Sequence, residues 1–216
     1  ETRGGSVGTI LGIPGVPAAI FASIAVLAAA DIFTAYMPVL GEEQGISPGV
    51  VGVLLALRAA SSIASRLGIG KLVALVGRLR LMTLSAFAAA FAFGGVALSD
   101  HVAVLAALSL VAGFGLGFGQ PLSMTLVAQL VPPHARATAL SVRISGNRVG
   151  QITAPAAAGL VAGTAGAAAA FWLMAAVLAA SGLVLQRSPA AGSTVDEDAS
   201  ELEVRSQEAI TTRMNE

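Results

Sequence analysis

The sequence has no cysteine, two histidines and few charged residues. Without cysteine the chain forms neither a disulfide nor a thiolate metal site. His101 and His134 stand in separate short connections, so we expect solvated loop residues and no metal ligands. Charged residues make up 11% of the 216 and hydrophobic residues 56%, a balance that a water-soluble domain could hardly keep without exposing apolar surface. We expect no cofactor and no nucleic-acid partner.

Long apolar stretches fill most of the chain instead. Each is near the ~20 residues needed to cross about 30 Å of hydrocarbon as a helix. Lipid satisfies no exposed backbone group, and the stretches are too long for barrel strands. The sequence therefore predicts an all-α, polytopic membrane protein with six transmembrane helices, over residues 18–40, 49–65, 81–98, 102–127, 138–162 and 167–185.

The basic residues lie on alternate connections between these stretches. Arg66, Lys71, Arg78 and Arg80 lie in one connection, and Arg136 lies beside His134 in another. The remaining connections, 41–48, 99–101 and 163–166, contain neither Lys nor Arg. By the positive-inside rule the basic connections and both termini are predicted to be cytoplasmic. We expect a multi-pass protein of the plasma or inner membrane, with the lipid bilayer as its surroundings.

The two ends of the chain differ from the centre. Residues 1–17 are rich in Gly and Pro, and no basic region with a cleavage site precedes the first apolar stretch. We therefore expect a linker cut from a longer protein and no signal peptide. Residues 18–187 are predicted to form the six-helix bundle. Residues 188–216 are acidic and are predicted to be a disordered cytoplasmic tail, with at most one short helix over 199–213.

Ionisable residues inside the stretches are costly in lipid, so they indicate function. Asp31, Arg58 and Arg148 are predicted to share one layer near the middle of the membrane. Arg143 is nearer the cytoplasmic edge, and we interpret it as an anchor whose long side chain reaches the headgroups. A purely structural network of buried arginines remains the alternative.

Polar residues of the fifth stretch follow a helical spacing. Arg143, Asn147 and Gln151 recur every four residues with Arg148 one step around, so they form a stripe predicted to face water or substrate. Pro155 predicts a kink below the stripe, and Gly150, Gly159 and Gly163 predict a small-residue packing face.

A run of glycines marks the fourth stretch. Gly113, Gly115, Gly117 and Gly119 precede Pro121, which frees a backbone carbonyl one turn earlier. Two interpretations stay open: close helix packing, or a flexible helix that lines a cavity, which Gln120 favours.

These motifs resemble those of major facilitator superfamily transporters. Residues 70–80 resemble the second copy of the family's loop motif, in which Gly is followed by three residues, Asp, a basic residue, one residue, Gly and two basic residues. Gly70, Gly77 and Arg78 match, whereas Ala74 and Leu75 replace the acidic and the first basic position. Residues 146–159, with Gly150, Pro155 and Gly159, are similar to the eleventh helix of drug-efflux members, and residues 113–121 suit the tenth.

The resemblance implies the carboxy-terminal half, helices seven to twelve, of a twelve-helix transporter built from two inverted three-helix repeats per half. It implies that residues 1–17 are a remnant of the central cytoplasmic loop and that an amino-terminal six-helix half is the partner. Substrate would bind near the midplane between the halves. The side chains implied to face that cavity are Asp31, Tyr36, Arg58, Gln120, Asn147, Arg148 and Gln151.

The function expected from this resemblance is secondary active transport, as proton-coupled efflux of small organic molecules by alternating access. Asp31 would bind the proton, its charge balanced by Arg58 or Arg148. An intramembrane enzyme is disfavoured, because no histidine lies in a stretch and only one carboxylate is central. A non-transporting membrane subunit or a truncated, inactive half-transporter remains the alternative, and so does pairing of two copies of this half.

Overall fold

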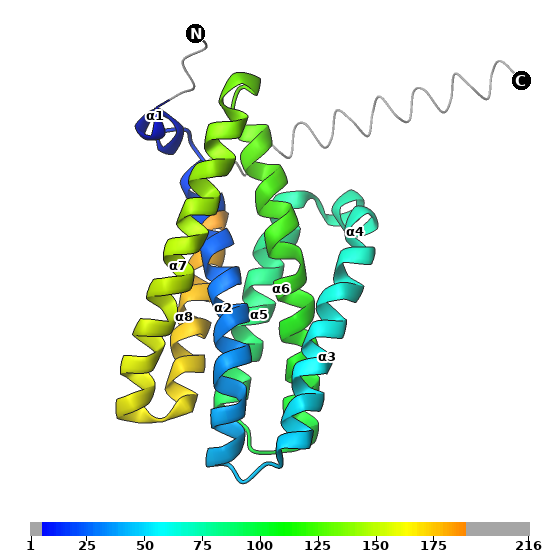
Figure 1. Ribbon diagram of the computed structural model, residues 1–216. Coiled ribbons are helices and arrows are strands. Elements are labelled where there is room, and N and C mark those ends of the chain that lie inside the picture. The colour runs from blue at the N-terminus through cyan, green and yellow to red at the C-terminus, as the bar shows by residue number, and fades with distance from the viewer. Residues whose placement is uncertain (1–5, 189–216) are drawn as a thin grey trace, which may run out of the picture.

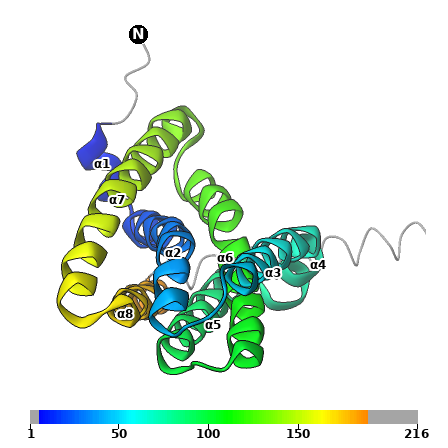
Figure 2. The ribbon, with the colours of Figure 1, turned by 60° about the horizontal axis from the view of Figure 1, so that its bottom comes forward.

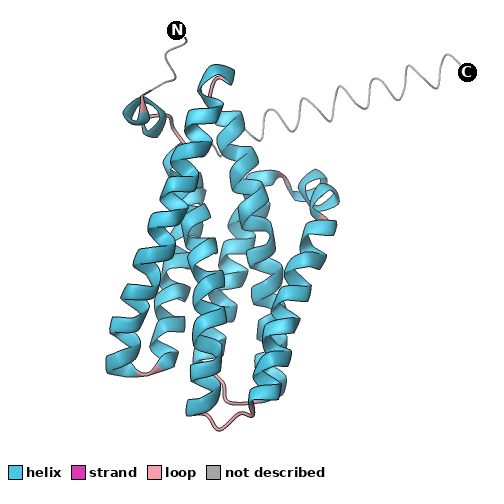
Figure 3. Cartoon of the chain, in the orientation of Figure 1, coloured by secondary structure: helices cyan, strands magenta, loops and turns pink. Residues whose placement is uncertain are grey.

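The structure, a computed structural model, describes residues 6–188, and every regular element in that part of the chain is helical (Figures 1 and 3). The all-α prediction is confirmed for these residues. The predicted tail from residue 189 onward, with its short helix, lies outside them. The elements are α1 (Val7–Leu11), α2 (Val16–Glu43), α3 (Pro48–Leu67), α4 (Ile69–Val76), α5 (Arg78–Leu98), α6 (Val102–Leu130), the 3₁₀ turn η1 (Pro133–Ala135), α7 (Arg136–Ala165) and α8 (Ala167–Gln186).

Each of the six apolar stretches is a long helix whose observed ends lie within a few residues of the predicted ones. Among the described residues, α2, α3, α5, α6 and α8 are long and apolar enough to cross a membrane. The 30-residue α7 is long enough, but it carries Arg143, Asn147 and Arg148 in its middle and is not among them. Five candidate spans are therefore confirmed by length and composition. The helix α7 lies in the same bundle, packed against α2 and α8 (Figure 1).

The helix α2 lies at the centre of the arrangement. It packs against α6, α7 and α8, while α5 lies between α6 and α8 and α3 packs on α6 (Figure 2). Three buried rings, Phe33 of α2, Phe93 of α5 and Phe171 of α8, hold this core together, with centroids 5.5 to 5.7 Å apart. Edge-on contacts of this kind stabilise a core beyond the area that they bury.

The turns between helices are short, and four of them contain a glycine with positive φ, at Gly15, Gly45, Gly77 and Gly166. Gly77 separates α4 from α5 with φ of 82°, and Gly166 separates α7 from α8 with φ of 78°. Both values lie in the left-handed region, which a residue with a Cβ adopts only at a cost. A single residue thus reverses the chain between α7 and α8, which places these helices side by side.

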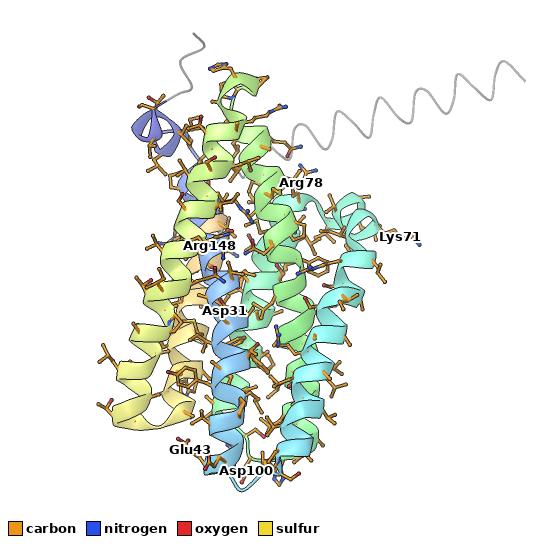
Figure 4. The ribbon with its side chains drawn as sticks, in the orientation of Figure 1. Asp31, Glu43, Lys71, Arg78, Asp100 and Arg148 are labelled. Atoms are coloured by element: carbon orange, nitrogen blue, oxygen red, sulfur yellow. The ribbon has the colours of Figure 1, made fainter. Side chains whose placement is uncertain are left out.

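Charges divide between the two ends of the bundle. We call the end that carries α4 and η1 the basic end, because Arg66, Lys71, Arg78, Arg80 and Arg136 lie there. The opposite end, the acidic end, carries Glu42, Glu43 and Asp100 and has no Lys or Arg in its connections (Figure 4). The basic connections, which alternate with non-basic ones along the sequence, therefore lie together at one end of the bundle. The side of the membrane that each end occupies stays a prediction.

Residues 1–17, predicted as a linker, contain the single turn α1. The hydroxyl of Ser6 accepts a hydrogen bond from the backbone N–H of Thr9 and caps this turn. Ile10 is buried with Val16 in an apolar cluster near the basic end. The described part of the segment is thus packed against the bundle.

Candidate functional site: two polar clusters inside the helix bundle

The glycine run of α6 brings its neighbours close enough to share polar groups. A Cβ on Gly113 or Gly117 would overlap the backbone of α3 at Arg58 and Ser62. A Cβ on Gly115 would lie 2.6 Å from the carbonyl oxygen of Ser85 on α5. Gly119 faces Val26 of α2 at a similar distance. The run therefore serves three close helix contacts, which is the packing interpretation of the sequence.

The first polar group, which we call the Asp31 cluster, joins α2, α3 and α7. Gln151 Nε2 donates to Asp31 Oδ2 at 2.9 Å. Arg148 Nη1 in turn donates to Gln151 Oε1 at 2.9 Å. Gln151 thus lies between a carboxylate and a guanidinium and bonds to both. Figure 4 labels Asp31 and Arg148, the two charged members of this chain of hydrogen bonds.

Arg58 approaches the same carboxylate from the side of α3. Its Nη2 donates to Thr34 Oγ1 at 3.4 Å, and its guanidinium carbon lies 5.6 Å from the ring centroid of Phe33. Thr34 lies three residues after Asp31 and so shares its helix face. Arg58 therefore contacts the helix face that carries Asp31, whereas the guanidinium of Arg148 reaches Asp31 through Gln151.

The second polar group, which we call the Arg143 cluster, lies nearer the basic end. Arg143 Nη2 donates to Gln120 Oε1 and to Ser123 Oγ, both at 2.8 Å. Asn147 accepts a hydrogen bond from Ser23 Oγ at 2.9 Å, and Gln120 Nε2 donates to the Ser23 carbonyl at 2.9 Å. These contacts connect α2, α6 and α7 through neutral acceptors. Since Ser23 precedes Asp31 by two helical turns, the two clusters lie about 12 Å apart in depth.

The prediction that Arg143 anchors at the membrane surface is wrong. Its side chain is 5% exposed and points into the bundle, because Gln120 and Ser123 of α6 offer it acceptors. The polar stripe of α7 was expected to face water or substrate; Arg143 and Asn147 are buried, so these two do not face water, and contact with substrate stays a prediction. Arg148 is exposed, as predicted. Ser23 and Ser123 were missed, because a single serine within an apolar helix gives no signal.

The predicted cavity residues thus separate into two groups. Asp31, Arg58, Arg148 and Gln151 come together, whereas Gln120 and Asn147 belong to the Arg143 cluster. Tyr36 is half-buried and packs beside the apolar core, and it follows Asp31 by five residues on α2.

The small residues of α7 have unequal surroundings. Gly150 packs against Ile24 of α2 so closely that a Cβ would overlap it. Gly159 meets only the Tyr36 hydroxyl, 3.5 Å from the Cβ position, and Gly163 has no neighbour within 4 Å among the described residues. The predicted packing face is confirmed at Gly150 and is wrong at Gly163. Pro155 lies inside α7, which continues through it as a helix.

Basic residues in and beside the loop motif tie α5 and α3 to α6. Gly70 has open space around it, and Gly77 makes the turn into α5. Arg78 Nη1 donates a hydrogen bond to Gln129 Oε1 near the end of α6. Arg66 Nε donates at 3.4 Å to the carbonyl of Gly117, the group that Pro121 leaves without its helical partner. Both contacts fix the basic end of the bundle.

Within residues 6–188 no group of three His, Asp or Glu side chains lies close enough to hold a metal ion. The clusters offer hydrogen-bonding groups and charges inside the bundle. Polar and ionisable side chains within otherwise apolar helices are typical of membrane transporters.

Comparison with known proteins agrees with this interpretation. No curated protein matches the sequence. The family model of the Major Facilitator Superfamily matches residues 19–212, which is most of the chain. The protein is therefore a multi-pass membrane protein that belongs to the Major Facilitator Superfamily of transporters.

Proposed function

We propose that this chain is the carboxy-terminal six-helix half of a secondary active transporter. It would pair with an amino-terminal half outside these 216 residues and contain two inverted three-helix repeats. Family membership and the helical bundle support this proposal. The separation of charge favours a basic end on the cytoplasmic side of the plasma or inner membrane, because Lys and Arg are retained there.

The proposed activity is proton-coupled efflux of small organic molecules by alternating access. Its support is the Asp31 cluster, in which the carboxylate accepts a hydrogen bond from Gln151 of α7 and Arg58 of α3 bonds to Thr34, one turn further along α2. Ionised Asp31 attracts both partners. Protonated Asp31 loses its charge, so its attraction for α3 and α7 weakens and the balance between inward-open and outward-open forms shifts.

The sharpest test replaces Asp31 in the complete transporter. Asp31→Asn keeps the size of the side chain and can still accept a hydrogen bond from Gln151, but it cannot exchange a proton. We expect proton-driven efflux from reconstituted vesicles to be lost while insertion into the membrane is unchanged. Glu42→Gln, an exposed carboxylate at the acidic end, is the matched control and should leave efflux intact.

A panel of organic compounds, assayed with and without a proton uncoupler, identifies the substrate and the coupling together. Efflux of a compound that stops on adding the uncoupler supports the proposal. Unchanged proton-driven efflux by the Asp31→Asn variant would contradict it.

A further inference from the structure

The short helix α4 has one face toward the bundle and one face exposed. Ile69, Leu72 and Val73 are half-buried against the apolar cluster of the basic end. The other face consists of Gly70, Lys71, Ala74 and Leu75, all exposed; together with exposed Leu67, the last residue of α3, we call it the α4 face. The spacing of the two sets follows the helical repeat, so the division is a property of the helix.

The α4 face is unusually apolar for a surface. Leu67 is 86% exposed and Leu75 80%, the two highest values among the exposed large hydrophobic side chains of the described residues. Leu75 and Ala74 occupy the positions at which the loop pattern of the family has a basic and an acidic residue. The chain thus exposes a leucine at a position where a charged side chain would be better hydrated.

The position of α4 places this face at the surface of the bilayer. The candidate span α3 ends at Leu67, and the candidate span α5 begins at Arg78, two residues after α4 ends. A helix tied this tightly between two spans stays within the headgroup region. Figure 1 shows α4 turning away from the axis of α3 at the end of the bundle.

Among residues 6–188 the charged side chains around α4 are all basic. Lys71 and Arg80 are exposed, and Figure 4 shows Lys71 pointing away from the bundle. Within the described residues the acidic side chains near a membrane surface lie at the acidic end, and the one ion contact found is Asp100 with His101 there. The positive charges beside α4 therefore have no protein carboxylate to neutralise them in this part of the chain.

We propose that α4 is an interfacial helix that binds anionic lipid. Leu67 and Leu75 enter the acyl region just below the headgroups, and Lys71 and Arg80 hold the phosphate groups of anionic lipids. Apolar side chains beside basic ones are the combination that an anionic bilayer surface accepts. The long Lys71 side chain keeps its ammonium group at headgroup level while its stem stays in the apolar layer.

The absence of cysteine makes a clean test possible. A single Leu75→Cys substitution, labelled with an environment-sensitive fluorophore, reports on position 75 of the full chain in vesicles. Ser47→Cys, in the connection at the acidic end, is the control, because Ser47 is exposed and its side chain makes no capping bond. Nitroxide groups attached high on the acyl chain should quench the label at position 75 strongly and that at position 47 weakly.

The lipid preference is tested with the nitroxide on either phosphatidylglycerol or phosphatidylcholine, each as a minor component of phosphatidylcholine vesicles. We expect the anionic lipid to be enriched at position 75 by about fivefold per basic side chain engaged. The double substitution Lys71→Gln with Arg80→Gln should abolish the enrichment, and Lys71→Arg should retain it. Neither side chain packs in the core, so folding is unaffected, which the helical circular dichroism signal checks.

Three results would overturn the proposal. A water-like emission at position 75 without quenching would mean that α4 is solvated. A blue-shifted emission without quenching would mean that protein, such as the second half of the transporter, covers the α4 face. Equal quenching by both lipids would remove the anionic headgroup as the ligand.

Discussion

Gln151 on α7 donates a hydrogen bond to Asp31 on α2 over 2.9 Å and accepts one from Arg148 over the same distance. The amide is the only described group that connects this carboxylate to this guanidinium by hydrogen bonds. Gln151→Leu should therefore uncouple α7 from the charge state of Asp31. We expect proton-driven transport to fall by about tenfold or more, since the substitution removes two hydrogen bonds to charged groups and each contributes about 1.5–3 kcal/mol.

The matched control for Gln151 lies on the same helix. The hydroxyl of Thr153 bonds only to the carbonyl of Val149 in its own turn. Thr153→Ala should leave transport in reconstituted vesicles unchanged. A Gln151→Leu variant that transports as fast as Thr153→Ala would contradict the role of the amide.

Substitution of the buried Arg143 is expected to lower the stability of the bundle. Arg143→Met keeps the length of the side chain but leaves Gln120 Oε1 and Ser123 Oγ without their strongest donor. We expect a loss of about 1–3 kcal/mol, because buried acceptors lose a partner. Ser123→Ala combined with Arg143→Met should cost less than the sum of the single changes in denaturant unfolding. Additive costs would show that the two side chains do not act together.

The contact between α3 and α6 is tested by adding a single methyl group. Gly117→Ala places a Cβ where Ser62 and Ser65 of α3 already lie, so the helices must separate. We expect a destabilisation of about 1–3 kcal/mol, read as a lower melting temperature in detergent. Gly70→Ala is the control, since no atom lies within 4 Å of its Cβ position, and it should be neutral or slightly stabilising. Equal effects of the two changes would contradict close packing at Gly117.

Glu43 supplies a charge at the start of α8. Its two carboxylate oxygens accept from the backbone N–H of Ala167 at 3.0 and 3.2 Å. Glu43→Gln keeps an acceptor but removes the charge that favours a helix N-terminus, a loss of about 0.3–1 kcal/mol at low salt. Exposed Glu42→Gln should have no effect on the melting temperature. The difference between the two variants should shrink as salt is raised, and a difference that grows would exclude the electrostatic cause.

The two ends of the bundle should open to different compartments. Ser47 lies at the acidic end and His134 lies in η1 at the basic end, both exposed. In the cysteine-free background, Ser47→Cys should react with an impermeant thiol reagent from outside the cell and His134→Cys only after permeabilisation. Equal labelling of both from one side would disprove the separation.

Much of the fold could be predicted because the bilayer imposes it. The length and apolarity of the stretches predicted the six long helices, and the basic connections predicted which turns share an end. The small helix α4 was not predicted, because the sequence of an eight-residue amphipathic helix within a basic connection is hard to distinguish from that of a loop.

The candidate site was less predictable. Spacing placed Arg143, Asn147 and Gln151 on one face of α7, but spacing does not say which neighbour that face meets. The acceptors of Arg143 lie on α6, at residues Gln120 and Ser123, and nothing local to Arg143 indicates them. Its burial therefore depends on a contact between helices, whereas the pairing of Asp31 with polar groups followed from the cost of a lone charge in lipid.

The two kinds of helix contact have different mechanical consequences. Where α3 meets α6, glycine and serine bring the backbones together, so much of this contact involves small side chains and backbone atoms. The rings of Phe33, Phe93 and Phe171 interlock, so α2, α5 and α8 can shift only if the rings separate. Shear during a transport cycle is therefore expected along the seam between α3 and α6, with the phenylalanine triad as the fixed pivot.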